Sequence, residues 1–130
     1  MFVAFMPRGV GLSALTENER HITQARRRFM LLGQTLAGMQ VWDVRRCVEL
    51  ISKLGYKCPV TLWGYDDTAS LVSLASLFEE ISTVHVKGYP ENDKEQPDYL
   101  NISRIATPSQ ILDLVRKRSR VNVLDKPKKK

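Results

Sequence analysis

The sequence predicts an α/β fold, a three-layer sandwich in which a short, mostly parallel sheet of about four strands carries helices on both faces. Two observations support this class. Short apolar runs alternate along the chain with helical patterns, in the order strand, helix, strand, helix, strand, helix, strand. The runs are continuously apolar, which is typical of parallel strands covered by helices on both sides.

The N-terminal region is predicted to hold the first strand and a helical crossover. Residues 2–6, FVAFM, form an apolar run that we interpret as a buried strand. Thr16 and Glu19 have the spacing of a capping box, which predicts a helix over about 17–32. A second helical pattern follows and ends at Gly55. Its apolar face comprises Val41, Val44, Cys47, Val48, Ile51 and Leu54.

The rest of the chain is predicted to add three strands and two helices. The runs at 58–64 and 82–90 predict the second and third strands. Between them, residues 68–80 are apolar on almost every side, which indicates a buried helix. Thr107, followed by a proline, predicts the start of the last helix, and RVNVLD at 120–125 predicts the fourth strand.

Length and charge favour one domain at 1–125 with a basic, solvated tail at 126–130. Residues 116–130 carry eight Lys or Arg against one acid, Asp125, while the other 115 residues have a net charge of −1. We therefore expect no sequence-specific nucleic-acid binding. No apolar run approaches the ~20 residues of a membrane helix, so no membrane is expected as a partner. Because residues 1–11 lack the apolar core of a signal peptide, a cytoplasmic location is the default expectation.

No cofactor or metal motif is found. Cys47 and Cys58 make neither a disulfide framework nor a ligand pattern. Asp66, Asp67 and Asp125 follow predicted parallel strands, where ligands bind in open α/β sheets. Their spacing repeats no known cation site, so we expect no metal and no cofactor.

The segment LWGYDDTASL, residues 62–71, has the outline of a nucleophile elbow without the usual nucleophile. An apolar run reaches Gly64, the chain turns through short polar residues, and a helical pattern opens at Ala69. Hydrolases with this geometry place Ser third in G-x-S-x-G, beside a helix N-terminus. Here Asp66 stands in that place. Three interpretations are open: an aspartate nucleophile, a relative that has lost its chemistry, or an ordinary turn whose acids are stabilised by the helix dipole.

Three segments extend this outline: ARRRFMLLGQTLAGMQVWDVRRCVELI, VTLWGYDDTASLVSLASLFEEISTVHVKGYP and PDYLNISRI. Through them the sequence resembles the α/β-hydrolase superfamily, and most closely the acetyl xylan esterase and dienelactone hydrolase type of ester hydrolase. The likeness runs over nearly all of residues 1–125 but corresponds only to the middle of such an enzyme. The substrate class that it implies for the parent family is a small-molecule carboxylic ester.

The resemblance also implies roles for individual residues. Asp66 lies at the nucleophile position, the backbone N–H of Asp67 is one donor of the oxyanion hole, and Asp125 lies near the usual place of the triad acid. Attack by Ser requires a histidine as base and an acid that orients it. The family's histidine follows a later strand that this sequence does not contain, and the second oxyanion donor comes from a loop upstream of Met1.

The two histidines do not occupy the family's catalytic position. His21 is expected to be exposed on the first helix, and His85 to have a local partner in the third strand. We therefore expect a fragment or degenerate relative of an esterase-type hydrolase, inactive by itself. The alternative is a small α/β binding or interaction module, and a third hypothesis is an active hydrolase with Asp66 as nucleophile. An unpaired sheet edge is expected to promote self-association.

Overall fold

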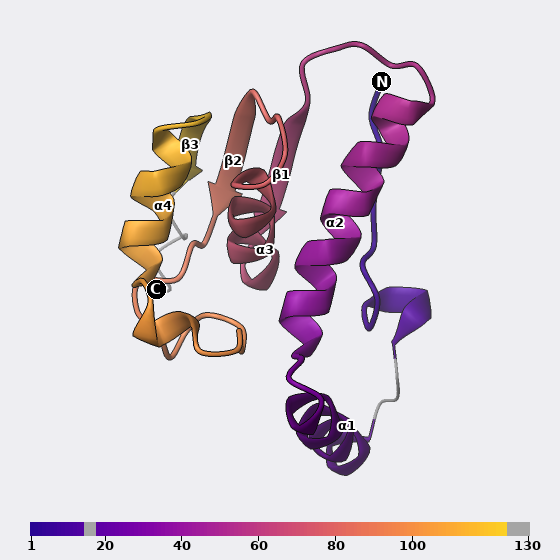
Figure 1. The fold of residues 1–130 in the computed structure, drawn as a ribbon, viewed down its shortest axis with the longest axis vertical. Coiled ribbons are helices and arrows are strands. Elements are labelled where there is room, and N and C mark those ends of the chain that lie inside the picture. Colours follow the sequence, from indigo (N-terminus) through magenta and orange to yellow (C-terminus); the bar gives the residue numbers. More distant parts are fainter. Residues whose placement is uncertain (15–17, 125–130) are drawn as a thin grey trace, which may run out of the picture.

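The computed structural model describes residues 1–14 and 18–124, apart from the side chain of Leu12 (Figure 1). The predicted cap at Thr16, the acid Asp125 and the tail at 126–130 lie outside this part of the chain. The elements are, in chain order, the 3-10 helix η1 (Gly11–Ser13), α1 (Glu19–Leu31), α2 (Leu36–Lys53), β1 (Thr61–Tyr65), α3 (Asp67–Ser76), β2 (Thr83–Lys87), the 3-10 helix η2 (Ile102–Arg104), α4 (Pro108–Arg116) and β3 (Arg120–Leu124).

The strands form a parallel sheet in the order β1-β2-β3. Trp63 lies opposite His85, which lies opposite Asn122. Helix α3 connects β1 to β2 and α4 connects β2 to β3, as parallel neighbours require. The α/β class, the parallel pairing and the strands predicted at 82–90 and 120–125 are thus confirmed, and the strand predicted at 58–64 is found at Thr61–Tyr65.

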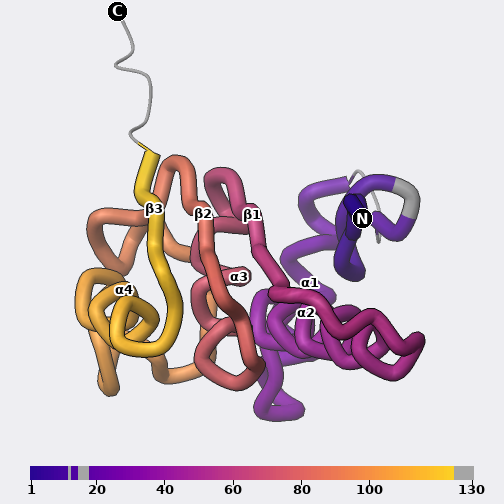
Figure 2. Tube along the Cα trace, turned by 90° about the horizontal axis from the view of Figure 1, so that it is seen from above, coloured from indigo at the N-terminus to yellow at the C-terminus, as the bar shows by residue number. Residues whose placement is uncertain are grey.

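The core lies between one face of the sheet and its helices. Helices α3 and α4 cover that face, and α2 packs beside α3 (Figures 1 and 2). The inward positions of the central strand, Val84 and Val86, are fully buried. Helix α3 is buried from Ala69 to Ser76, as the apolar pattern predicts.

The prediction of helices on both faces is wrong for the described chain. Trp63 and Tyr65 point to the face opposite the helices and are 51% and 52% exposed. Figure 2 shows α2, α3 and α4 on one side of the three strands. A continuous apolar run predicts burial on both faces. When the run includes aromatic residues such as Trp63, this prediction can fail, because aromatic residues are also stable on a half-exposed strand surface.

The predicted first strand is also absent, because residues 2–6 pair with no described strand. All of them are exposed, and the chain becomes anchored on α2 only at Pro7 and Arg8. The described part of the sheet therefore has three strands rather than four. Apolar composition alone predicts strand propensity, but a strand also needs a neighbour for its backbone groups.

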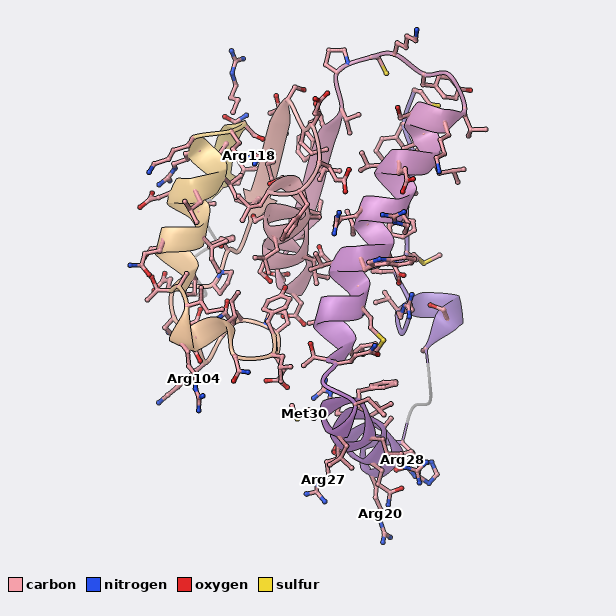
Figure 3. The ribbon with its side chains drawn as sticks, viewed as in Figure 1. Arg20, Arg27, Arg28, Met30, Arg104 and Arg118 are labelled. Atoms are coloured by element: carbon pink, nitrogen blue, oxygen red, sulfur yellow. The ribbon has the colours of Figure 1, made fainter. Side chains whose placement is uncertain are left out.

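The predicted helices at 17–32 and after Thr107 agree with the structure, because the start of each is determined by capping residues close by in the chain. Thr107 caps α4, accepting from the N–H of Gln110 while its own N–H donates to Gln110 Oε1, at 3.4 and 2.9 Å. Asn18 caps α1, whose bounds agree with the predicted 17–32 to within two residues. No residue of α1 is buried, and its side chains Arg20, Arg27 and Arg28 project away from the rest of the molecule (Figure 3).

The contact between β1 and α3 requires glycine at position 64. A Cβ added at Gly64 would lie 2.6 Å from the backbone oxygen of Thr68 and 2.6 Å from Cγ2 of Val72. Real side chains do not approach so closely, so only a residue without Cβ lets the strand meet the first turns of the helix. The helix consequently starts directly after the strand, with a single residue between them.

We predict that Gly64→Ala lowers the free energy of unfolding by about 3 kcal/mol, because backbone and Val72 must both move. The control is Gly55→Ala, at φ +87 with open space around the added Cβ, which should cost only about 1 kcal/mol of backbone strain. Denaturant unfolding of both variants is the measurement. Equal losses would show that the strand–helix contact is not tight.

Candidate functional site

The turn between β1 and α3 places Asp66 at the C-terminal edge of the sheet in a strained conformation. Its backbone has φ 48 and ψ −119, in a region that favours glycine. The turn is fixed by its neighbours: the Asp66 N–H donates to Lys87 O at 2.8 Å, and the Ala69 N–H donates to Asp66 O at 2.9 Å. A non-glycine residue there costs about 1–3 kcal/mol, which the surrounding bonds must offset.

Thr68 closes the turn from the other side. Its hydroxyl accepts from the N–H of Tyr65 and donates to the carbonyl of Tyr65, each at 2.8 Å. The last residue of β1 is therefore bonded to the helix rather than to another strand. Thr68 stands at the fifth place of the elbow pattern, where the G-x-S-x-G motif has glycine.

The Asp66 side chain does not act as a helix cap. An N-cap aspartate normally accepts from the second or third N–H of the helix. Asp66 makes no such bond, and its side chain is exposed. The interpretation as an ordinary turn remains open, because Asp66 and Asp67 both stand at the N-terminus of α3, where the helix dipole stabilises acids without a capping bond. The geometry is a sharp strand-to-helix turn that presents a side chain beside a helix N-terminus.

A pocket of about 430 Å³ opens beside the elbow. Asp67 and Thr68 line one part of it, and Gly9 and Val10 line another. The latter two belong to residues 7–11, which we call the PRGVG loop. The structure thus brings the turn after β1 beside a loop that precedes α1 in the sequence. Other polar lining residues are Arg26, Thr35, Gln40, Glu95, Gln96 and Asp98. In the described chain, no cluster of His, Cys, Asp or Glu could hold a metal ion.

The PRGVG loop is held on α2 by a two-pronged ion pair. Arg8 donates from Nε to Oδ2 of Asp43 at 2.8 Å and from its second terminal nitrogen to Oδ1. The backbone N–H of Arg8 also donates to Oδ2, at 3.1 Å. These hydrogen bonds hold the pKa of Asp43 below its ordinary value. Gln40 adds a bond from Nε2 to the carbonyl of Arg8 at 2.9 Å.

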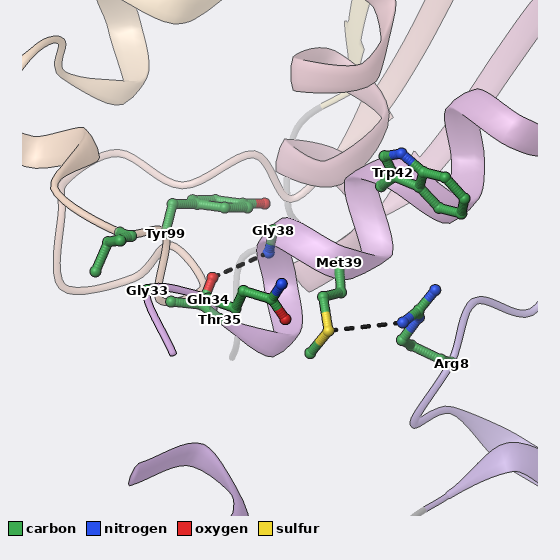
Figure 4. A pocket seen from close by; sticks show the side chains of 9 residues that line it. Arg8, Gly33, Gln34, Thr35, Gly38, Met39, Trp42 and Tyr99 are labelled. Atoms are coloured by element: carbon green, nitrogen blue, oxygen red, sulfur yellow. Dashed lines mark hydrogen bonds between the residues drawn. The ribbon is translucent and has the colours of Figure 1, made fainter. Parts of the chain in front are cut away.

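A second, more open groove of about 630 Å³ lies along α2 (Figure 4). It is lined by Arg8, Gly33, Gln34, Thr35, Gly38, Met39, Trp42, Tyr99 and Leu100. Arg8 in this groove is ion-paired with Asp43, and the Arg46 guanidinium carbon lies 5.0 Å from the centroid of the Trp42 ring.

Tyr99 is a site-adjacent residue that sequence reasoning missed. Its hydroxyl lies 2.8 Å from Oγ of Ser70 on α3, and burial raises the pKa of the phenol well above its usual range. Tyr89 donates to Pro108 O at 3.0 Å, and burial raises its pKa to about 12. Both tyrosines fix the polar loop 88–106 to the helices beneath it. Only the aromatic residues within that polar stretch could have signalled this role.

The histidines lie away from the elbow pocket. His21 is exposed on α1, as expected. His85 stacks on Trp63 with ring centroids 4.0 Å apart, and its Nδ1 lies 3.2 Å from Nδ2 of Asn122. The expectation of a local partner is confirmed, on the sheet face opposite the helices. Neither histidine lines the pocket beside Asp67. Asp66 and Asp67 are brought to one turn, whereas Asp125 lies outside the described residues.

We predict that Asp66→Gly raises the free energy of unfolding by about 1 kcal/mol, because glycine relieves the positive φ and no capping bond is lost. Asp67→Gly is the matched control and should destabilise by a similar amount, since Asp67 is helical and acidic in the first turn of α3. Thermal and urea unfolding measure both. A destabilised Asp66→Gly variant would mean that the aspartate side chain supports the fold.

We predict that Asp43→Asn loosens the PRGVG loop, raising hydrogen–deuterium exchange over residues 8–13 several-fold while costing about 1 kcal/mol in stability. Because the folded pKa of Asp43 is lowered, its contribution is present above the ordinary carboxyl pKa of about 4 and is lost as the pH falls through the folded value. Acid should therefore reproduce the variant's exchange pattern. Asp113→Asn, in an exposed ion pair on α4, should leave the loop unchanged.

Among the described residues, no helix is both long and apolar enough to cross a membrane. Comparison of the chain with protein-family models, with curated proteins and with solved structures finds no match.

Proposed function

We propose that this protein is a degenerate relative of an esterase-type α/β hydrolase, of the acetyl xylan esterase and dienelactone hydrolase kind, without ester hydrolysis by itself. The observation that supports it most is the elbow: Asp66 in a strained strand-to-helix turn, directly after a strand whose Gly64 approaches α3 closely. In this proposal β1, β2 and β3 correspond to the central part of a larger hydrolase sheet, and the chain to a fragment of such an enzyme.

The residues at the elbow argue against turnover. A carboxylate that attacks an ester carbonyl forms an acyl anhydride and expels an alkoxide, and water must then cleave the anhydride with help from a base. Neither His21 nor His85 lines the elbow pocket. A second carboxylate at Asp67 lies at the helix N-terminus, where it opposes the negative oxygen that an oxyanion hole has to stabilise.

A binding or interaction module is the second candidate, favoured by the open sheet face. Trp63, His85 and Asn122 form a row across the three strands, with a stacked pair of rings and an amide beside it. Tyr65 and Lys87 follow in the next row. Half-exposed aromatic rings beside polar groups are a common feature of surfaces that bind partners.

We predict that the purified chain does not hydrolyse short-chain aryl esters above the buffer rate, in either the wild type or the Asp66→Ser variant. Serine alone should not restore activity, because loss of one triad member already costs on the order of 10⁴-fold. Spectrophotometric release of the aryl alcohol is the measurement, with Asp113→Ala, an exposed position on α4, as a surface control. Turnover that is abolished by Asp66→Ala and kept by Asp113→Ala would instead establish an aspartate nucleophile.

A further inference from the structure

The outer edge of β1 is a free sheet edge. In the described chain, β1 pairs with β2 alone, on one side. Val60 O accepts from Ser82 N–H, and Asp66 N–H donates to Lys87 O, so the even-numbered residues of this stretch direct their backbone groups toward β2. Both groups of one residue point the same way in a parallel ladder. Thr61, Trp63 and Tyr65 therefore face the outer edge.

Part of this edge is already closed. The N–H and C=O of Tyr65 are both bonded to the hydroxyl of Thr68. Among the described residues, the backbone groups of Thr61 and Trp63 have no such partner and are available for another strand. The edge also lacks the usual protection, because TLWGY contains no charged residue and no proline. The opposite edge strand, β3, begins with Arg120.

The same chain carries a strand-forming segment without a partner. Residues 2–6, which we call the N-terminal arm, are all exposed, with Phe2 at 89%. Pro7 is buried and Arg8 is fixed to Asp43, so the arm projects from an anchored point on α2. The arm and β1 each have five residues, and both are apolar. In the structure the arm runs beside α2 and does not pair with β1 (Figures 1 and 2).

We propose that the N-terminal arm of one copy adds as an edge strand to β1 of a second copy, and that the exchange is reciprocal. The occupant is a second copy because one chain supplies both halves: an unpaired apolar arm, and an unprotected edge of equal length. Reciprocal exchange uses the same two surfaces in each protomer and closes into a two-fold dimer. The inference is independent of the proposed lack of ester hydrolysis, which is measured separately.

The test uses one variant that blocks the edge of β1 and another that removes the N-terminal arm. Thr61→Pro removes an edge-facing N–H at the first residue of β1, where proline is compatible with a strand and the bonds to β2 are kept. Thr61→Val is its matched control and retains the N–H. Deletion of residues 1–6 removes the arm but keeps the edge. Circular dichroism establishes that each variant is folded.

Sedimentation equilibrium at micromolar concentrations should show a dimer for the full chain and for Thr61→Val. Thr61→Pro and the arm deletion should each dissociate at least tenfold more readily. Mixing the two defective chains should restore association as a 1:1 heterodimer, because one contributes the arm and the other the edge. If Thr61→Pro proves unfolded, a fluorescent peptide of residues 1–7 replaces it and should bind the arm-deleted chain, whereas the same peptide with Val3→Asp and Phe5→Asp should not.

Three results would overturn the inference: a monomeric full chain, dimerisation that survives the arm deletion, or defective chains that fail to complement each other. Association retained by both variants would show that another exposed apolar surface is responsible. The outcome leaves the ester assay unaffected, so the two proposals fail separately.

Discussion

The rest of the structure depends on the contact between β1 and α3 at Gly64. Because no Cβ separates the strand from Thr68 and Val72, the helix can begin one residue after the strand ends. That close start lets α3 cross back over β1 and β2 and bury its residues from Ala69 to Ser76 against one face. Helices α2 and α4 then pack on either side of α3. The contact also forces the sharp turn at Asp66, so fold and candidate site share one constraint.

The Asp66 side chain makes no capping hydrogen bond that would offset the strain in its backbone. Lys87, Ala69 and Thr68 hold the turn through backbone and hydroxyl groups, and the carboxylate makes no capping bond. Strained backbone of this kind persists where surrounding structure over-determines it, and it is concentrated at functional sites. At Asp66 the surrounding backbone and hydroxyl bonds determine the turn, and no capping bond of the carboxylate contributes to it.

The sequence predicted those elements whose position depends on residues close together in the chain. The Thr107 cap, the strands at 61–65, 83–87 and 120–124, and the buried helix after Gly64 follow from capping residues, strand formers and apolar pattern. The number of layers did not follow, because an apolar run does not reveal whether a second helix covers it. The anchoring of Arg8 on Asp43 and of Tyr99 on Ser70 joins residues 35 and 29 positions apart, which no local pattern encodes.

The uncovered surfaces have one physical origin. Helices α3 and α4 complete the inner face of the sheet, so the free energy of folding is supplied by the core clusters around Val84 and Leu71. The arm, α1 and Trp63 contribute little to that core, since none of their side chains is fully buried. Burial of these surfaces against a partner would therefore add stability to a fold that its own core already holds together. Because β1 belongs both to the core and to the free edge, a strand added there would extend the same sheet that positions the elbow.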